Sequence, residues 1–224
     1  MFWTSPENGA WAQASASLFR AFASAGGERI VGAGSCSEYA WQDAPLDEAD
    51  TPELPGSLYG EAKLAAWRGL ESLAGEAGVS AAWGRVFFLY GPREHARRLV
   101  ASVTRALLSG ERAASTEGSQ RRDFLHVDDV GSAMAAILLS DARGPVNIAS
   151  GKAVPVREVV SKIARAIGRE DLLDVGALPT RAGEPAVIEG RNERLLATGW
   201  RPRFGLDSGI DQTIAWWKRA LGRE

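Results

Sequence analysis

The pattern of apolar and polar positions predicts a chain in which helices and strands take turns. A helix that begins at Thr-Ser-Pro-Glu and ends at a pair of glycines is expected to pack through Trp11, Leu18 and Phe22. An apolar run of small and branched residues follows, as in a buried strand. The elements predicted for the first part of the chain are a helix at 4–27, a strand at 30–34, a helix at 58–77 and a strand at 80–89.

The rest of the chain continues the alternation of predicted helices and strands. A polar segment at 40–57, rich in acids and prolines, is typical of an exposed loop between two elements. The further predicted elements are helices at 96–108, 127–140, 155–167 and 206–221 and strands at 123–127 and 146–149. Strand, helix and strand in this order predict an α/β fold with a parallel sheet. The last helix fits a small C-terminal lobe.

Composition excludes several classes of protein and site. The chain has 224 residues, of which 45% are apolar and 24% charged, and a net charge of −2, so it is expected to be globular and not to bind nucleic acid. Its single cysteine, Cys36, cannot form an internal disulfide, and its two histidines lie far apart, so no metal site is predicted. No apolar run approaches the roughly 20 residues that cross a bilayer. A cytoplasmic protein without a membrane segment is therefore expected.

A tyrosine and a lysine four residues apart are the first candidates for chemistry. Tyr59 and Lys63 stand near the start of a predicted helix, where this spacing puts both side chains on one face. A free phenol has a pKa near ~10, and a neighbouring ammonium favours the phenolate, so Tyr59 could exchange protons near neutral pH. An ordinary surface pair has the same spacing. Ser35, at the end of the strand at 30–34, supports the chemical interpretation, since strand ends in such sheets meet the ligand crevice.

These residues together resemble a known family. A serine at a strand end, an aromatic four residues later and a downstream Y-x-x-x-K are similar to the extended short-chain dehydrogenase/reductases, the NAD-dependent epimerase/dehydratase group that modifies nucleotide sugars. The resemblance covers nearly the whole chain. It continues through the segments GRVFFLYGP, RRDFLHVDDV, GPVNIASG and RAGEP.

The resemblance implies that different parts of the chain bind the cofactor and the substrate. Residues 1–92 would form the later part of a Rossmann-like dinucleotide-binding domain, and residues 93–224 mainly a small α+β substrate lobe, with 122–150 returning to the sheet. Ser35 would hydrogen-bond the reacting substrate oxygen, Tyr59 would exchange its proton, and Lys63 would bind the ribose of NAD or NADP. Phe87 would lie beside the cofactor.

The substrate end of the implied site lies later in the sequence. By the resemblance, Arg122 and Arg181 would bind the diphosphate of a nucleotide sugar, to which guanidinium groups offer paired hydrogen bonds. Solvated surface arginines are the alternative. Phe88 would contact substrate where the family often has asparagine. Cys36 and Ser37 replace the Asp-Glu pair of the dehydratases, so epimerisation or ketone reduction is expected rather than dehydration.

The resemblance also implies an N-terminally truncated sheet. Neither G-x-G-x-x-G nor G-x-x-G-x-x-G occurs among the 25 glycines, so the pyrophosphate-binding turn of the family is missing from the sequence. The strand at 30–34 would then be an edge strand. Three explanations follow: a start further upstream, which is favoured, a homodimer or swap across that edge, or a remnant without dinucleotide binding. The sequence thus predicts an NAD(P)-dependent nucleotide-sugar epimerase or ketoreductase, with a non-catalytic chain that self-associates or pairs with another chain as the alternative.

Overall fold

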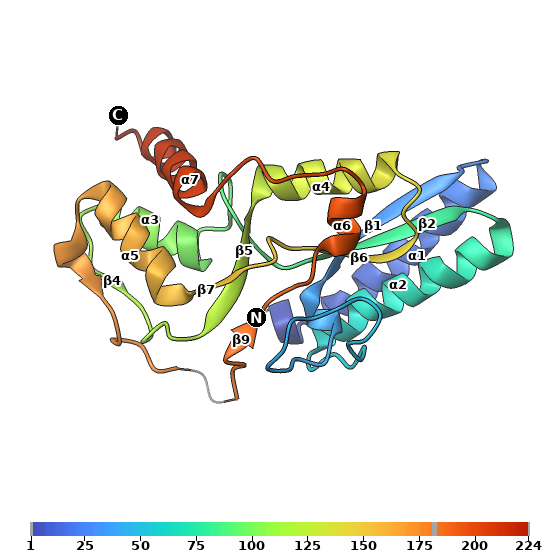
Figure 1. Ribbon diagram of the computed structural model, residues 1–224, viewed down its shortest axis with the longest axis horizontal. Coiled ribbons are helices and arrows are strands. Elements are labelled where there is room, and N and C mark those ends of the chain that lie inside the picture. The colour runs from blue at the N-terminus through green and yellow to red at the C-terminus, as the bar shows by residue number, and fades with distance from the viewer. Residues whose placement is uncertain (1, 181–182, 224) are drawn as a thin grey trace. The chain divides into compact units, whose positions relative to one another are not determined.

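The computed structural model describes residues 2–180 and 183–223, and contacts divide the chain into two compact units (Figure 1). The first unit comprises Met1–Phe87, Ser132–Ala149 and Gly190–Arg201, and the second comprises Phe88–Gly131, Ser150–Glu189 and Pro202–Glu224. Each unit is therefore assembled from three separate stretches of chain. The boundary expected between residues 92 and 93 assigns cofactor and substrate roles, and it stays a prediction.

Three parallel strands in the order β1-β2-β6 form the sheet of the first unit. They are β1 (Arg29–Ser35), β2 (Ser80–Val86) and β6 (Gly144–Ile148). Ser35 lies opposite Val86 and Val86 opposite Ile148, so the carboxyl ends of all three strands meet at one edge of the sheet. This Rossmann-like arrangement confirms the predicted α/β class, and it brings chemistry-bearing strand ends together.

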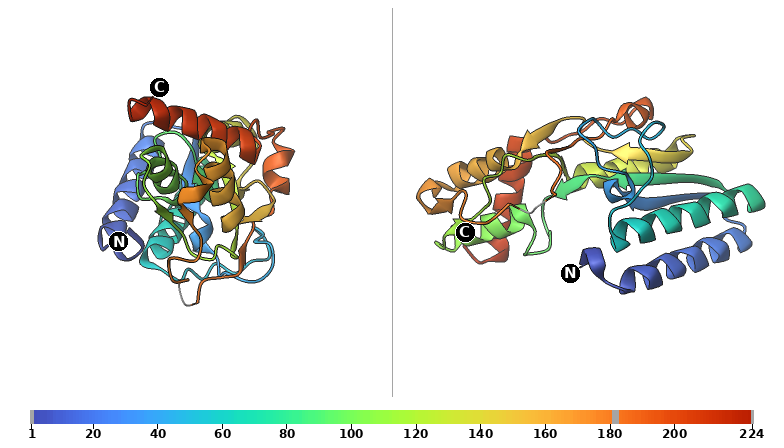
Figure 2. Two further views of the ribbon diagram at one scale, coloured as in Figure 1. Left: turned by 90° about the vertical axis from the view of Figure 1, so that its left-hand side faces the viewer. Right: turned by 90° about the horizontal axis from the view of Figure 1, so that it is seen from below.

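Helices cover both faces of this sheet. Figure 2 shows α2 (Leu58–Ala77) between the strands and α1 (Glu7–Ser24). On the opposite face, Gly84 of β2 lies against Met134 of α4 (Val127–Leu139), whose first turns belong to the second unit. The unit also contains the short helices η1 (Phe2–Thr4), η2 (Cys36–Glu38) and α6 (Glu193–Ala197).

Helix α1 does not pack through the predicted side chains. Trp11 is 72% exposed, Leu18 67% and Phe22 42%, whereas Ala12, Phe19 and Ala23 pack against the core formed by α2, β1 and β2. The covered stripe is thus shifted by one residue along the sequence. The reason is that α1 rests on another helix rather than on the sheet, so only the part of its wide apolar surface that faces α2 is buried.

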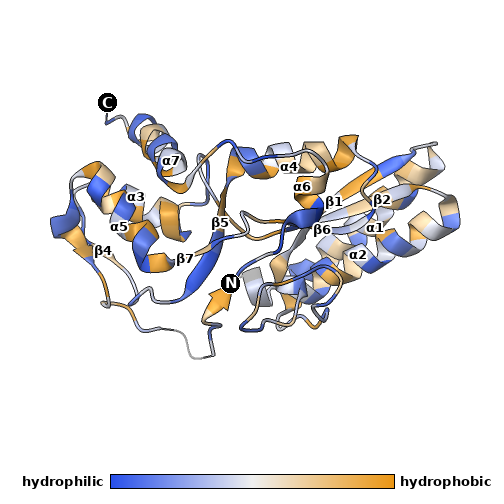
Figure 3. Cartoon of the chain, viewed as in Figure 1, coloured by the Kyte–Doolittle hydropathy of each residue, from blue (hydrophilic) through white to orange (hydrophobic). Residues whose placement is uncertain are grey.

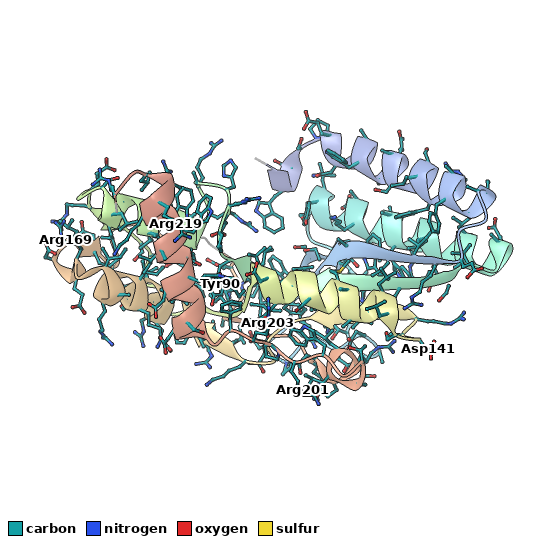
Figure 4. All side chains as sticks on the ribbon, turned by 90° about the horizontal axis from the view of Figure 1, so that it is seen from above. Tyr90, Asp141, Arg169, Arg201, Arg203 and Arg219 are labelled. Carbon is teal, nitrogen blue, oxygen red and sulfur yellow. The ribbon has the colours of Figure 1, made fainter. Side chains whose placement is uncertain are left out.

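The second unit is a small α+β lobe whose core lies between three helices. They are α3 (Leu99–Leu108), α5 (Val156–Ile167) and α7 (Leu206–Ala220), and Val103, Ile163 and Ile214 are among the buried side chains that join them. Tyr90 packs into the same core, with its hydroxyl 3.4 Å from the Leu206 carbonyl oxygen (Figure 4). Apolar and polar stretches alternate along the helices of both units, as Figure 3 shows.

The strands of the lobe are short and mixed in direction. Parallel pairs join β3 to β5, β5 to β9 and β4 to β8, whereas β5 and β7 are antiparallel. Their bounds, with that of the short helix η3 (Glu170–Leu172), are β3 (Phe88–Tyr90), β4 (Ala113–Ala114), β5 (Arg121–His126), β7 (Ala153–Pro155), β8 (Leu173–Asp174) and β9 (Val187–Ile188). The single strand predicted at 80–89 is wrong, because the chain leaves the first sheet at Phe87 and enters another at Phe88.

Candidate active site

The Ser35 side chain is held by a tight turn at the carboxyl end of β1. Its hydroxyl oxygen accepts the Ser37 N–H at 3.2 Å and its O–H donates to the Ser37 hydroxyl at 3.2 Å. The Ser35 N–H in turn donates to Glu38 Oε1 at 2.7 Å. Serine and glutamate thus form a capping box on η2, and the serine is 7% exposed. The turn gives the Ser35 hydroxyl a defined position at the strand end.

Tyr59 and Lys63 lie one turn apart near the start of α2, as predicted. The helix begins there because the Ser57 hydroxyl accepts the Gly60 N–H at 3.1 Å. Lys63 Nζ is 5.9 Å from the centroid of the Tyr59 ring and donates to the Ala33 carbonyl oxygen of β1 at 2.8 Å. Lys63 therefore connects the tyrosine to the strand that carries Ser35.

The surroundings of Lys63 disfavour its charged form. Burial lowers the pKa of the ammonium below its usual value, and the negative charge of Glu38 opposes that shift. The Tyr59 ring is in addition held edge-on by the Trp3 indole, with ring centroids 5.3 Å apart and planes at 85°. The pair is thus partly enclosed, which strengthens the electrostatic interaction between its members.

A buried charge network beside Ser35 was missed by the sequence analysis. Glu38 and Arg85 have wholly buried side chains, and Arg85 Nε donates to Glu38 Oε2 at 2.8 Å. Arg85 also pairs with Glu53 and lies over the Tyr39 ring, 4.4 Å from its centroid. Two signals could have revealed the network. The segment from Ser35 to Glu38 has the S-x-x-E spacing of a capping box, and an arginine interrupts the otherwise apolar strand β2.

Phe87 follows β2 directly and stays in the first unit. Its N–H donates to the Ile148 carbonyl oxygen at 3.1 Å, and its side chain is 5% exposed. Its ring lies so close to Gly190 that a Cβ at that position would meet ring carbons at 2.6 and 2.8 Å. The aromatic ring is therefore packed into the fold, and its role beside a cofactor stays a prediction.

Arg122 and Phe88 come together in the second unit. The guanidinium carbon of Arg122 lies 5.6 Å from the centroid of the Phe88 ring. Its Nη2 donates to Glu184 Oε1 at 2.6 Å, and its Nη1 donates to the carbonyl oxygens of Arg121 and Pro185. The Arg122 side chain is 5% exposed and that of Glu184 is 25% exposed. The guanidinium thus already binds an anion, the carboxylate of its own chain.

The predicted site residues fall into two groups. Ser35, Tyr59, Lys63 and Phe87 belong to the first unit, and the first three are joined through β1 and α2. Arg122 and Phe88 belong to the second unit. The predicted diphosphate ligand Arg181 lies outside the described residues.

The described part of the chain contains neither a metal cluster nor a membrane-spanning helix. Among those residues, no group of three or more His, Cys, Asp and Glu side chains could hold a metal ion. Within the same ranges no helix combines the length and the apolar character needed to cross a membrane.

Comparisons with known proteins agree with the resemblance. A family model described as the NAD dependent epimerase/dehydratase family matches residues 4–149. The structure of MoeE5 in complex with UDP-glucose and NAD is 34% identical with a TM-score of 0.83, and the match covers 93% of this chain and 71% of that one. The UDP-glucose 4-epimerase of Thermus thermophilus, in complex with NAD, is 26% identical with a TM-score of 0.82, covering 92% and 69% of the two chains.

Curated relatives match over a smaller share of their own length. The UDP-glucose 4-epimerase of Halalkalibacterium halodurans is 27% identical over 198 residues, which is 78% of this chain and 58% of that protein. The CDP-abequose synthase of Salmonella muenchen is 25% identical over 134 residues, which is 58% of this chain and 46% of that protein. The chain therefore spans about half the length of these relatives.

Proposed function

Because the chain belongs to the NAD dependent epimerase/dehydratase family, we propose that it oxidises or reduces a carbinol carbon of a nucleotide sugar, as an epimerase or a ketoreductase. One observation carries the proposal. Lys63 connects the Tyr59 ring to the Ala33 carbonyl oxygen, two residues before Ser35. A phenol, an ammonium and a serine hydroxyl at one strand end are the groups that move a proton on and off a substrate hydroxyl.

The roles follow from the chemistry of the three side chains. Tyr59 takes the proton of the sugar hydroxyl when the carbon is oxidised and returns it when the carbonyl is reduced. The Lys63 ammonium stabilises the negative charge on the phenol oxygen while the proton is away. The Ser35 O–H turns from the Ser37 hydroxyl to the same sugar oxygen, donates a hydrogen bond to it and so fixes its distance from the phenol.

The donor set of the first unit suits the nicotinamide end of a dinucleotide. An ammonium has three donors, and one N–H of Lys63 goes to the Ala33 carbonyl oxygen, so two can reach ribose hydroxyls. The sequence contains no glycine-rich turn for the pyrophosphate. Bound NAD or NADP would supply the acceptor for the hydride of the sugar carbon and the donor that returns it. Similar structures contain NAD, which supports this choice.

The second unit supplies the binding of the nucleotide diphosphate. Arg122 would exchange the Glu184 carboxylate for a diphosphate oxygen and keep its contact with the Phe88 ring. Structures similar to this chain contain UDP-glucose or UDP-glucuronic acid, which supports a UDP-sugar as the first substrate to test. Cys36 and Ser37 next to Ser35 offer no carboxyl acid–base pair, which supports epimerisation or reduction over dehydration.

A second candidate function is favoured by the exposed surface of α1. Trp11 and Leu18 are 72% and 67% exposed on one stripe of this helix, and β1 has β2 as its one strand partner among the described residues. Both features are typical of a surface that another chain covers. A non-catalytic chain that self-associates would present the same surface. Light scattering after gel filtration measures whether the purified protein is larger than a monomer.

Two measurements on the 224-residue protein test the proposal. NADH or NADPH fluorescence should saturate on titration, and UDP-glucose should be epimerised or oxidised in the presence of NAD. Tyr59→Phe should then lower turnover by about 10²- to 10⁴-fold, because the phenol proton is lost while the ring is kept. NADH and UDP-glucose binding should change little. Unchanged turnover in Tyr59→Phe would remove the assigned role, and an associated protein without dinucleotide binding would favour the second candidate.

A further inference from the structure

We propose that Glu38, held in place by Arg85, is a positioning residue that fixes the Ser35 hydroxyl relative to the helix that carries Tyr59. The expected effect on catalysis rests on the proposed function, whereas the fixing of the turn rests on the buried contacts of the first unit alone. Four observations lead to it.

The carboxylate of Glu38 accepts hydrogen bonds from the turn and from the neighbouring strand β2. Its Oε1 accepts the Ser35 N–H at 2.7 Å, and its Oε2 accepts Arg85 Nε at 2.8 Å. The Trp83 indole N–H lies within reach of both oxygens, at 3.0 and 3.1 Å. Glu38 itself is 0% exposed, so no water competes for these contacts. A carboxylate in this position binds the backbone of Ser35 with a charge-assisted hydrogen bond.

The charge of Glu38 depends on Arg85. Burial raises the pKa of Glu38, and Arg85 and the hydrogen bonds from Trp83, Arg85 and Ser35 oppose that rise. Arg85 is also wholly buried, and it lies on β2 directly opposite Gly34, the residue before Ser35. The ion pair therefore joins the turn that follows β1 to the neighbouring strand β2. Removing either member would leave a buried charge without its partner.

The turn is also pressed against α2. A Cβ at Gly60 would collide with the carbonyl oxygen of Ser37, so the turn and the first turn of α2 touch through their backbones. Gly60 is the residue after Tyr59. A displacement of the turn therefore changes the distance between the Ser35 hydroxyl and the tyrosine helix.

A second link runs from Arg85 to the same helix. Arg85 Nη2 pairs with Glu53, and Glu53 pairs with Arg68 of α2. Glu53 comes from the loop between η2 and α2, and its side chain is 18% exposed. Strand β2, this loop and α2 are thus tied to one guanidinium. The network holds the serine and the tyrosine helix as one rigid group.

The sole cysteine of the chain provides a direct test that needs no catalysis. Cys36 lies between Ser35 and Glu38 in the turn and is 5% exposed, so a thiol reagent reaches it only when the turn opens. Glu38→Gln should raise the rate of Cys36 modification under native conditions by roughly tenfold or more, because a neutral amide holds Arg85 and the Ser35 N–H less tightly. Glu61→Gln, the same change at an exposed position of α2, should leave the rate unchanged.

Steady-state kinetics with UDP-glucose give the second readout. Glu38→Gln should lower kcat by about ten- to a hundredfold while KM stays within about twofold, since a misplaced serine affects the reacting oxygen and not the diphosphate. Arg85→Lys, which keeps a cation beside Glu38, should fall between wild type and Glu38→Gln in both measurements. This second variant decides the question if Glu38→Gln does not fold.

The outcomes separate the two proposals. Faster Cys36 modification together with a lower kcat supports the positioning role. An unchanged modification rate overturns it, and so does faster modification with an unchanged kcat. If the wild-type chain turns over no substrate, the proposed function fails, and the modification rates still decide whether Glu38 holds the Ser35 turn.

Discussion

Two arginines of this protein are almost equally buried and differ in the partners that hold them. Arg85, in the first unit, is 0% exposed and pairs with Glu38, which is also 0% exposed, and with Glu53, which is 18% exposed. Arg122, in the second unit, is 5% exposed and pairs with Glu184, which is 25% exposed and belongs to a loop. The first pair is closed to solvent on both sides. The second has one side that an anion from solution can reach.

Burial of the carboxylate partner separates a guanidinium that stabilises the fold from one that can bind a ligand. A guanidinium that has one carboxylate partner inside the core cannot exchange that partner for an anion from solution, and removing the guanidinium leaves a buried charge uncompensated. A guanidinium whose one carboxylate partner is partly exposed has a partner that a diphosphate can replace. This difference supports the proposals that Arg85 positions Ser35 and that Arg122 binds substrate.

The largest expected effect is on the stability of Arg85→Met. This change leaves the wholly buried Glu38 without its cation, so the free energy of unfolding should fall by about 3–5 kcal/mol. Urea unfolding followed by tryptophan fluorescence measures it. Arg68→Met is the matched control, because Arg68 pairs with the same Glu53 but its side chain is 56% exposed. This substitution should lower the free energy of unfolding by less than about 1 kcal/mol. Equal losses in the two variants would contradict the comparison.

A third carboxyl group extends the comparison, because it lies farther from its guanidinium than the carboxylates of the other two pairs do. Burial raises the pKa of Glu94 to about 7, and Arg98 is 3.9 Å away. The folded protein therefore keeps the Glu94 proton between pH 4.5 and about 7, where the unfolded chain has lost it. Stability due to this group is fully present below the unfolded pKa and is lost as pH rises through the folded pKa.

Glu94→Gln should remove this pH dependence. The amide is neutral at every pH and can still accept the Ala101 N–H that caps α3. At pH 8 the variant should be more stable than wild type by about 2–3 kcal/mol, and at pH 4 the two should be alike. Urea unfolding at several pH values measures this. Glu111→Gln, an exposed change in the same unit, should follow the wild-type curve. A wild-type stability that rises between pH 5 and 7 relative to Glu94→Gln would contradict the prediction.

The smallest of these effects is expected in ligand binding at Arg122. Arg122→Ala should weaken the binding of UDP by about ten- to a hundredfold, because charge-assisted hydrogen bonds to the diphosphate are lost. Isothermal titration calorimetry measures it. Glu184→Gln should act in the opposite direction and tighten UDP binding severalfold, since the competing carboxylate is gone. Arg169→Ala, at a charged position of the same unit paired with Asp171, serves as the control (Figure 4). Equal UDP affinity in all three variants would show that Arg122 is not a diphosphate ligand.

Local periodicity was enough to predict most elements of the sheet unit. The helix expected at 58–77 is α2 with the same bounds, and the strand expected at 30–34 is β1 with one residue more at each end. Both predictions succeed because helix caps and hydrophobic spacing depend on residues that are close in sequence. Ser57 caps the start of the helix, and Gly78 in the left-handed conformation ends it. The Tyr59–Lys63 spacing was readable for the same reason.

Helix α3 shows where local signals gave the wrong boundary. The helix expected to begin at Ala96 begins at Leu99. Arg98 is extended, and Arg93 has a φ of 64°, so the chain turns before the helix starts. Glu94 reaches forward to accept the Ala101 N–H at 3.2 Å and caps the helix from outside it. A cap supplied from several residues upstream has no fixed spacing, which is why the sequence did not show it.

The order of elements and motifs along the amino-acid sequence was enough to predict the α/β class and the family, and local spacing made Ser35, Tyr59 and Lys63 candidates for proton transfer. Which charges are buried together became clear only from the packing of the fold. Glu38 lies in η2 and Arg85 in β2, and they meet because the register of β1 and β2 puts Arg85 opposite Gly34, just before the turn. The same holds for α1, where contact with α2 buries Phe19 and leaves Trp11 exposed. Pairing between distant segments is a property of the packed chain, and no local pattern contains it.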